Sequence, residues 1–345
     1  MSPRPDVVVV GAGIVGLSTA FHLQENGASV TVVDRVGVGA GASGVQPGGV
    51  RQQWGTHANC LLAQESLRFY DDAVERLSMR VDPGFQQCGY LFLAHSSAVL
   101  GRLEANVALQ NSLGVPSRIV SPVEATELVP ELDASSAVGA AWCDEDGYFD
   151  RPQAIVEALG ALVDVELRDV TDVQDLVADA VVVAAGVDTP KLLPELPIRT
   201  EPRSLFFSDR IGERLLEPLV VSAEMGLAAK QLADGRLLAS DLREGSRANV
   251  RAGFEALLPR LVYVTLPLLV EGLYDVTPDH QPILGRVRDR IWVAAGFSGR
   301  GFMQAPAVGR IVAESILGIG SDPLLSVFDA ARFDEGRLVP EPSVV

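Results

Sequence analysis

The sequence predicts an α/β fold combined with an antiparallel β-sheet, in two domains that interleave along the chain. Residues 7–23, VVVVGAGIVGLSTAFHL, have the pattern of a buried strand, a glycine-rich turn and a helix. A second strand comes next and ends at Asp34, which completes a βαβ unit. A similar strand, turn and helix occur again at 289–317, whereas 202–242 and 262–276 have the pattern of antiparallel strands.

The elements between these landmarks are predicted by glycine content and apolar spacing. Residues 36–50 contain so many glycines that regular structure is not expected. Residues 57–78 have the spacing of one long amphipathic helix, and 85–143 alternate short strands with helical stretches. A helix with an N-cap is expected to begin at Pro152.

The second half of the chain returns to the first sheet. Residues 178–187 predict a third buried strand, whose Ala-Ala-Gly end lets another backbone come close. A helix at 246–261 separates the antiparallel strands, residues 289–296 form another strand of the first sheet, and 305–317 form the last long helix. The two domains must therefore exchange chain segments several times.

These assignments predict the limits of both domains. We expect a nucleotide-binding domain from residues 1–84, 144–200 and 277–330, and a substrate-binding domain from 85–143 and 201–276.

The first turn carries a dinucleotide-binding pattern. GAGIVG supplies Gly11 for the tight turn, Gly13 for close approach of backbone to a pyrophosphate, and Gly16 for close helix–strand packing. The helix after the turn points its N-terminus at the phosphates. Asp34, 23 positions beyond Gly11, is placed to accept the hydroxyls of an adenosine ribose and would repel the phosphate of NADP.

Composition excludes several classes of partner. The net charge of −17 argues against nucleic acid and anionic membranes. Three widely spaced cysteines fit neither a disulfide framework nor a zinc site, and the four histidines lack ligand spacing, so no metal is expected. No apolar stretch is long enough to span a bilayer, and the start of the chain lacks the pattern of a signal peptide. We expect a cytoplasmic protein.

The residues after Asp34 bear on the choice between NAD and FAD. A nicotinamide enzyme would continue with further βα units, but here a glycine-rich loop and a long helix come next. This loop, together with blocks elsewhere, resembles the D-amino-acid oxidase (DAO) family of FAD enzymes, in particular its sarcosine oxidases, glycine oxidases and proline dehydrogenase β-subunits. The blocks are GAGIVGLSTAFHL…VVDR, GASGVQPGGVRQQW, DGYFD, ADAVVVAAG, GLYDVTPDHQPILG and AAGFSGRGFMQAPAVGRIVAE.

The resemblance covers residues 7 to about 317 and implies both a fold and an activity. The fold would be a Rossmann-like FAD-binding domain of the glutathione-reductase type with an interleaved substrate domain on a mixed or antiparallel sheet. The activity would be oxidation of the C–N bond of a small carboxylate-bearing amine, such as glycine, sarcosine, an N-carboxymethyl amine or proline. The resulting imine would hydrolyse to an oxo acid and an amine, and O2 or an electron-accepting partner would reoxidise the flavin.

Alternatives remain open at this point. GGVRQQW also resembles mitochondrial complex I assembly proteins of the family, so a non-catalytic FAD-bound subunit or assembly factor is one alternative. A nicotinamide-dependent dehydrogenase that uses only the first motif is another. The oligomeric state is open, with a homo-oligomer as one expectation.

Four departures from the family pattern change the expectations. Gly272 stands where monomeric sarcosine oxidases link the flavin to a cysteine, so the FAD is expected to be non-covalent. The segment GRLLASD lacks the lysine that activates oxygen in those enzymes, and Lys230 in the preceding strand is not expected to replace it, which slightly favours an acceptor other than O2. Met303 and Arg300 stand where relatives carry a lysine and a histidine. Residues 151–184 are short, which predicts a trimmed β-hairpin.

The resemblance assigns roles to three residues. Arg51 is expected to bind the substrate carboxylate, because a guanidinium binds carboxylates in a bidentate way; a surface arginine or a salt bridge is the alternative. Tyr274 would donate a hydrogen bond to that carboxylate or pack in the core. Arg300 would be a second carboxylate ligand, a counter-charge for the reduced flavin or an exposed side chain.

The remaining site residues are expected to bind FAD. Gly299 and Gly301 would let backbone approach the flavin ring, with the next helix N-terminus stabilising negative charge on it. The full set is Gly11, Gly13, Ile14, Val15, Gly16, Asp34, Arg35, Ala42, Ser43, Gln46, Gly48, Gly49, Val170, Ala185, Gly186, Gly299, Arg300, Gly301, Phe302 and Met303.

Overall fold

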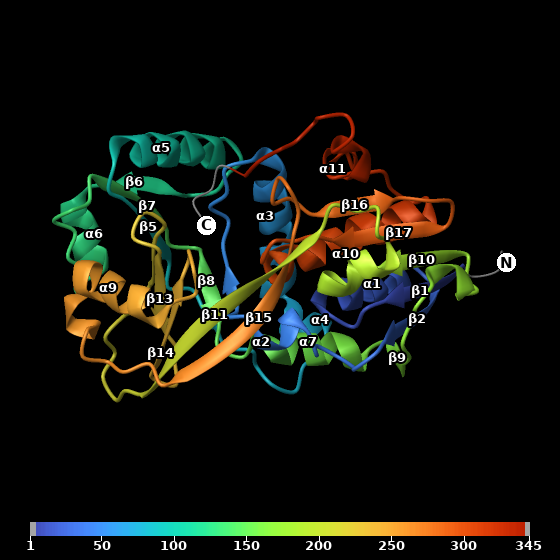
Figure 1. Ribbon diagram of the computed structural model, residues 1–345, viewed down its shortest axis with the longest axis horizontal. Helices are drawn as coiled ribbons and strands as arrows, with labels where there is room; N and C mark the ends of the chain where they lie inside the picture. Colours follow the sequence, from blue (N-terminus) through green and yellow to red (C-terminus); the bar gives the residue numbers. More distant parts are fainter. Residues whose placement is uncertain (1–4, 342–345) are drawn as a thin grey trace.

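A computed structural model describes residues 5–341 and shows two large sheets side by side (Figure 1). Residues 1–4, which begin the predicted nucleotide-binding domain, and 342–345 lie outside the described part. The first sheet has six strands in the order β16-β17-β10-β1-β2-β9. Their bounds are β1 Asp6–Val10, β2 Ser29–Asp34, β9 Asp164–Leu167, β10 Ala180–Val183, β16 Ile283–Arg286 and β17 Ile291–Ala295. All neighbours are parallel except β16 and β17, so the predicted Rossmann-like arrangement is confirmed.

The strands of the six-stranded sheet are apolar on both sides: the long helices pack on one face, and short turns and loop segments between residues 170 and 198 pack on the other. The helices of this half are α1 Ile14–Glu25, α3 His57–Asp71, α4 Ala73–Arg76, α7 Pro152–Ala161, α8 Thr189–Leu192, α10 Gly301–Leu317 and α11 Leu324–Val327. Helix α1 packs along α10, and α10 in turn packs on α3. Leu17 and Leu23 of α1 are fully buried in this core, where each side chain contributes about 1.5–3 kcal/mol.

The second sheet has eight strands in the order β15-β11-β14-β13-β12-β5-β7-β6. Their bounds are β5 Tyr90–Ala94, β6 Arg118–Val120, β7 Gly139–Cys143, β11 Arg199–Arg210, β12 Leu219–Ser222, β13 Leu227–Gln231, β14 Arg236–Asp241 and β15 Leu268–Val276. Only β12 and β5 pair in parallel, so the predicted mixed sheet is confirmed. Its helices are α5 Ser97–Ser112, α6 Pro122–Leu128 and α9 Arg247–Leu257.

A small three-stranded sheet lies between the two large ones (Figure 1). It consists of β3 Gly49–Val50, β8 Gly147–Phe149 and β4 Phe85–Gln86, with the short helix α2 Ala42–Val45 just before β3. The strands of the six-stranded sheet come from 6–34, 164–183 and 283–295. Those of the eight-stranded sheet come from 90–143 and 199–276. The predicted domain limits at 84, 143, 200 and 276 stay a prediction, since sheet membership does not fix where a domain ends.

Two predicted helices differ from the structure at their ends. The helix expected over 57–78 stops at Asp71, and a separate turn of helix, α4, comes after it. The helix expected over 246–261 ends at Leu257, because Pro259 has no N–H to donate and begins a short 3₁₀ turn instead.

The helix after DGYFD begins at Pro152 as predicted, but its start has no side-chain cap. Arg151 is the N-cap residue, and the carboxylate of Asp150 accepts hydrogen bonds from Gln86 and from the backbone of Ala233 instead. Among residues 5–341, no helix combines the length and the apolar character that crossing a bilayer requires.

Candidate functional site

The glycine-rich turn before α1 lies at the carboxyl end of β1, as the pattern predicts. Gly11 has φ +113°, and a Cβ there would lie 2.3 Å from the backbone oxygen of Ala184 at the end of β10. Only glycine fits both constraints without strain. The turn brings β1 and β10 together at the edge where ligands of open α/β sheets bind.

The N-terminus of α1 faces the glycine-rich loop. Gly13 is the N-cap residue and contributes no side chain, and the N–H of Ile14 donates to Oγ of Ser43 at 2.9 Å. A hydroxyl therefore lies where an anion is stabilised by a helix N-terminus.

Asp34 lies at the same edge of the sheet, at the carboxyl end of β2. Its Oδ2 accepts from the N–H of Ala12 at 2.9 Å, and its Oδ1 accepts from the N–H groups of Val36 and Gly37, each at 2.8 Å. The next residue, Arg35, forms an ion pair with Asp188 at 2.8 Å. These bonds fix the carboxylate beside the glycine turn, and its binding to a ribose stays a prediction.

The predicted nucleotide residues gather at this edge. Those at the turn, in the loop and at the end of β10 are Gly11, Gly13, Ile14, Val15, Gly16, Asp34, Arg35, Ala42, Ser43, Ala185 and Gly186. Val170 lies beyond the edge strand β9 and packs against the core of this half. In the segment 151–184, β9 is the one strand before β10, within the part of the chain that the structure describes.

The loop before β3 is held by two side chains. Gln46 Oε1 accepts from the N–H of Gly48 at 2.7 Å, and the carbonyl of Pro47 accepts from Nζ of Lys230 at 2.6 Å. The amide Nε2 of Gln46 is buried without a hydrogen-bond partner in the described structure. A buried donor without a partner is costly, so this nitrogen fits a ligand that supplies an acceptor.

Lys230 is a fully buried lysine on β13. Its ammonium lies 3.7 Å from the ring centroid of Tyr148, and burial lowers its pKa to about 7. The sequence pattern puts it in the strand before GRLLASD, and the structure places its nitrogen on the loop that carries Gln46 and Gly48.

Arg51 lies just after β3 and is buried, so the surface alternative is wrong. Its Nη1 donates to the carbonyl of Gln53 at 2.6 Å, and its guanidinium lies 3.7 Å from the ring centroid of Trp54. The indole N–H of Trp54 donates back to the carbonyl of Arg51 at 3.0 Å. Burial lowers the pKa of Arg51, with the charges of Tyr90 and Glu341 opposing that shift. A cavity of about 10 Å³, enough for one water, adjoins this guanidinium.

Asp146 holds the loop that carries Arg51. Its Oδ1 accepts from the N–H of Gln52 at 2.7 Å and its Oδ2 accepts from Nε2 of Gln53 at 3.0 Å. Burial raises the pKa of Asp146 to about 6, so the carboxylate is mostly ionised at neutral pH. Sequence reasoning did not assign a role to this residue: Asp146 opens the DGYFD block but has no recognisable spacing to Arg51.

Arg300 is the N-cap residue of α10 and is also buried, so it does not face solvent. Its Nη1 donates to Oε1 of Gln281 at 3.4 Å, and its guanidinium lies 5.3 Å from the ring centroid of Trp54. Burial lowers the pKa of Arg300 to about 10, which leaves it charged at neutral pH. Trp54, whose orientation the sequence did not determine, therefore brings two predicted arginines to one ring.

Tyr274 lies against the glycine turn that directly precedes Arg300. A Cβ on Gly299, which has φ +90°, would lie 2.3 Å from the ring of Tyr274. Burial raises the pKa of the Tyr274 hydroxyl, which therefore stays protonated and able to donate.

In the first turn of α10, the side chain of Phe302 packs in the core and that of Met303 lies by the loop before Arg51. Phe302 stacks on Tyr70, with ring centroids 5.0 Å apart, and its carbonyl accepts from the hydroxyl of Tyr70. Met303 lies by the loop, because a Cβ on Gly49 would be 3.7 Å from its Cε. Gly301 opens the helix.

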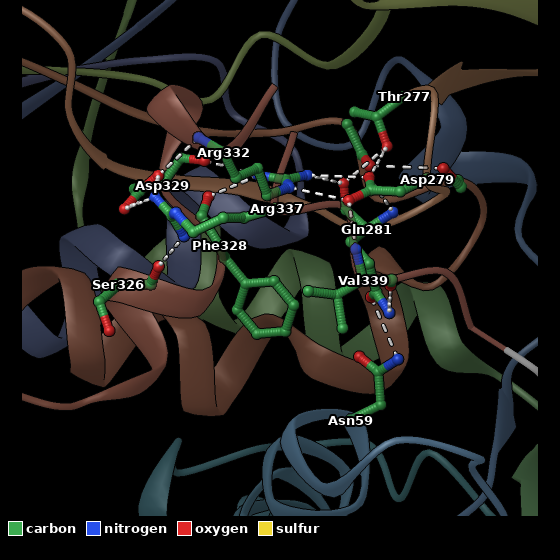
Figure 2. Close-up of polar contacts among 12 residues, drawn as sticks. Asn59, Thr277, Asp279, Gln281, Ser326, Phe328, Asp329, Arg332, Arg337 and Val339 are labelled. Atoms are coloured by element: carbon green, nitrogen blue, oxygen red, sulfur yellow. Dashed lines mark hydrogen bonds and ion pairs between the residues drawn. The ribbon is translucent and has the colours of Figure 1, made fainter. Parts of the chain in front are cut away.

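Sequence reasoning also missed the segment beyond 330. Asp279 forms a fully buried ion pair with Arg332 at 2.9 Å (Figure 2). Glu341 reaches the start of α3, where its carboxylate accepts from the N–H of Gly55 at 2.6 Å. No motif in the sequence announces either contact.

Comparison with known proteins identifies the family to which this arrangement belongs. The family model described as "DAO: FAD dependent oxidoreductase" matches residues 6–315. The fold is similar to the crystal structure of L-proline dehydrogenase from P. horikoshii, with a TM-score of 0.89 and 27% identity over 98% of this chain and 100% of that one.

Curated relatives give the same picture. Glycine oxidase of Geobacillus kaustophilus is 25% identical over the whole of both chains. Sarcosine oxidase subunit beta of Rhodobacter capsulatus is 26% identical over 99% of this chain and 92% of its own length. 4-Methylaminobutanoate oxidase (formaldehyde-forming) of Paenarthrobacter nicotinovorans is 25% identical over 94% of this chain, which spans 45% of that protein.

The family match decides between the two cofactors in favour of FAD. The helix N-terminus at Ile14, the closely approached backbone at Gly11 and the buried donor of Gln46 fit such a dinucleotide. The chain belongs to the DAO family of FAD-dependent oxidoreductases and is an FAD enzyme of the group that acts on amines and amino acids.

Proposed function

We propose that the enzyme oxidises the C–N bond of a small amino acid or N-substituted glycine to an imine, with glycine, sarcosine, N-carboxymethyl amines and proline as the substrate class. Water then hydrolyses the imine to an oxo acid and an amine. The observation that carries this proposal is the pair of buried guanidiniums, Arg51 and Arg300, on the ring of Trp54. A buried positive pair fits a substrate that carries a carboxylate.

The residues at the β1 edge would hold the cofactor. The start of α1 and Ser43 would bind the pyrophosphate, Asp34 the ribose, and Gln46 with the backbone of Gly48 and Gly49 the part nearer the reacting ring. When bound, FAD accepts the two electrons and the hydrogen released by oxidation of the C–N bond. O2 or an electron-accepting partner must then remove those electrons.

The polar side chains would orient the substrate. Arg51 and Arg300 bind the carboxylate and, by their charge, favour the neutral amine over the ammonium form. Tyr274, held protonated, donates a hydrogen bond at the turn before α10. A neutral amine is the reactive form because its lone pair assists the removal of hydrogen from the adjacent carbon.

The test is substrate-dependent reduction of the FAD-loaded protein, monitored with and without oxygen. We expect at least one of the four substrates named above to bleach the yellow flavin anaerobically. Recovery of the colour with O2 and formation of hydrogen peroxide would indicate an oxidase, and recovery only with an artificial acceptor would indicate a dehydrogenase. The proposal fails if none of these amines reduces the flavin.

A further inference from the structure

The segment of residues 332–341, here called the strap, is anchored by a buried network. Arg332 and Asp279 are fully buried and form an ion pair at 2.9 Å. The guanidinium of Arg332 also donates to the carbonyls of Phe328 at 2.8 Å and Gln281 at 3.0 Å (Figure 2). From this fixed first residue, the strap runs to the start of α3 (Figure 1).

Val339 continues the strap beside Gln281. The N–H of Val339 donates to Asp279 Oδ2 at 3.3 Å, and its carbonyl accepts from Nε2 of Gln281 at 3.0 Å. Oε1 of the same Gln281 accepts from Arg300 at 3.4 Å and from Nδ2 of Asn59 at 3.1 Å. One buried amide thus joins the strap to both Arg300 and α3.

Glu341 places a carboxylate at the arginine pair. Its Oε1 accepts from the N–H of Gly55 at 2.6 Å, and its Oε2 accepts from Thr56 Oγ1 at 2.9 Å and from Asn59. Gly55 comes directly after Trp54, on whose ring both guanidiniums lie. The negative charge of Glu341 raises the pKa of Arg51 and of Arg300 against the effect of burial.

The donors around Glu341 are those that would recognise a carboxylate of a ligand. A backbone N–H, a hydroxyl and an amide N–H converge on it, and the charges of Arg51 and Arg300 also interact with it. A ligand with two carboxylates would have to displace Glu341 to use these donors, whereas a ligand with one would need only the arginines.

We propose that Glu341 is a specificity-determining residue, which fills the second carboxylate position of the site and restricts it to amines with a single carboxylate. The proposal rests on the proposed function and narrows its substrate class. Glycine, sarcosine and proline would be accepted, and amines with two carboxylates, such as iminodiacetate, would be excluded.

The test compares two simple acids as probes of the FAD-loaded protein. Titration calorimetry measures the dissociation constants of acetate and succinate for the wild type, Glu341→Gln and Glu341→Asp. The glutamine variant keeps the size of the side chain and removes its charge, and the aspartate variant keeps the charge. Glu335→Gln is the matched control, because Glu335 lies on the same strap, is exposed and pairs with Arg337.

We expect Glu341→Gln to bind succinate about tenfold or more tightly than the wild type does, because a neutral amide holds these donors less strongly than a carboxylate and no longer repels the second carboxylate of the ligand. Acetate binding should tighten by a clearly smaller factor, because acetate needs only the arginines, on which the charge of Glu341 also acts. The aspartate and control variants should resemble the wild type. Equal tightening of both acids, or tightening of neither, would overturn the proposal. A fall in melting temperature with weaker binding of both acids would show that Glu341 only caps α3, and would overturn it too.

A second measurement separates this inference from the proposed function. Anaerobic reduction of the flavin by sarcosine and by iminodiacetate is compared in the wild type and in Glu341→Gln. If neither amine reduces either protein but the succinate shift is found, the proposed function fails and the inference about Glu341 stands. If sarcosine reduces both proteins and neither the succinate shift nor oxidation of iminodiacetate by the variant is found, the inference fails alone.

Discussion

At the scale of single residues, the site is organised by the aromatic ring of Trp54. Arg51 and Arg300 come from distant parts of the chain, and both guanidiniums lie on this fully buried indole. Cation–π contacts compensate part of the cost of burying two like charges. The arginines are therefore oriented before any substrate arrives, which lowers the entropy cost of binding.

The substitution Arg51→Met should mainly impair substrate binding. Loss of a charge-assisted contact to the carboxylate, worth about 1.5–3 kcal/mol, should lower kcat/KM for the substrate by about 10- to 100-fold, chiefly through KM. Steady-state kinetics measure the change. Arg288→Met is the control, because Arg288 is exposed and pairs with Glu195. Equal kinetic constants for wild type and Arg51→Met would contradict the assigned role.

Lys230 should make stability depend on pH. Its pKa falls from 10.5 to about 7 on burial, so the unfolded chain binds one more proton between these pH values and stability rises with pH across that window. Below about pH 7 Lys230 is charged in both the folded and the unfolded state, so the full cost of burying its charge lowers stability there. Lys230→Met should remove a slope of about 1 kcal/mol per pH unit from the unfolding free energy between pH 7 and 10.

Urea denaturation at a series of pH values measures this difference. Lys191→Met is the control, since Lys191 is exposed and pairs with Asp188. Parallel pH profiles for wild type and Lys230→Met would show that Lys230 is not the cause.

At the scale of elements, the turn between β1 and α1 is the most constrained. Gly11→Ala would force a side chain into φ +113° and place its Cβ 2.3 Å from the oxygen of Ala184. We expect a loss of about 2 kcal/mol or more in stability together with weaker FAD retention. Gly27→Ala is the matched control, because Gly27 also has positive φ, +87°, but nothing lies within 4 Å of its Cβ position.

Denaturation and flavin retention on gel filtration measure the two effects. The control should lose only the backbone strain, about 1–2 kcal/mol, and should retain its FAD. If both variants lose stability and FAD to the same extent, the close approach of β10 has no special role.

The elements that could be predicted from the sequence are those set by local patterns. The βαβ unit and the turns at Gly11 and Gly299 have glycines at fixed offsets, and each turn lies where that spacing predicts. The helix break at Asp72 could not be predicted, because apolar spacing continues across it. The contact of Glu341 with Asn59 joins residues 282 positions apart, and no local signal marks such a contact.

At the scale of the whole molecule, the site draws on all three sheets. Arg51 lies just after a strand of the small central sheet, Arg300 is the N-cap residue of a helix that packs on the six-stranded sheet, and Tyr274 belongs to the eight-stranded sheet. Any change in how these sheets pack would alter the distances among the three residues. The burial of Arg332 and Asp279 fixes the strap to the same region.

The ion pair of Arg332 and Asp279 should show strong coupling. Arg332→Met leaves a buried carboxylate without its partner and should cost about 3–5 kcal/mol of stability. The double variant Arg332→Met/Asp279→Asn should recover part of that loss, as a double-mutant cycle by urea denaturation would measure. Arg337→Met, which breaks an exposed pair with Asp329, should cost less than about 1 kcal/mol. Additive effects of the two buried substitutions would contradict the coupling.

The central claim is that two buried arginines select an amine by its carboxylate. The most direct measurement compares anaerobic reduction of the bound FAD by sarcosine and by dimethylamine, which is the same amine without the carboxylate group. The account predicts that sarcosine, or another acid of its class, reduces the flavin and that its carboxylate-free counterpart does so at least about 100-fold more slowly. Equal rates for the acid and its counterpart would contradict the account.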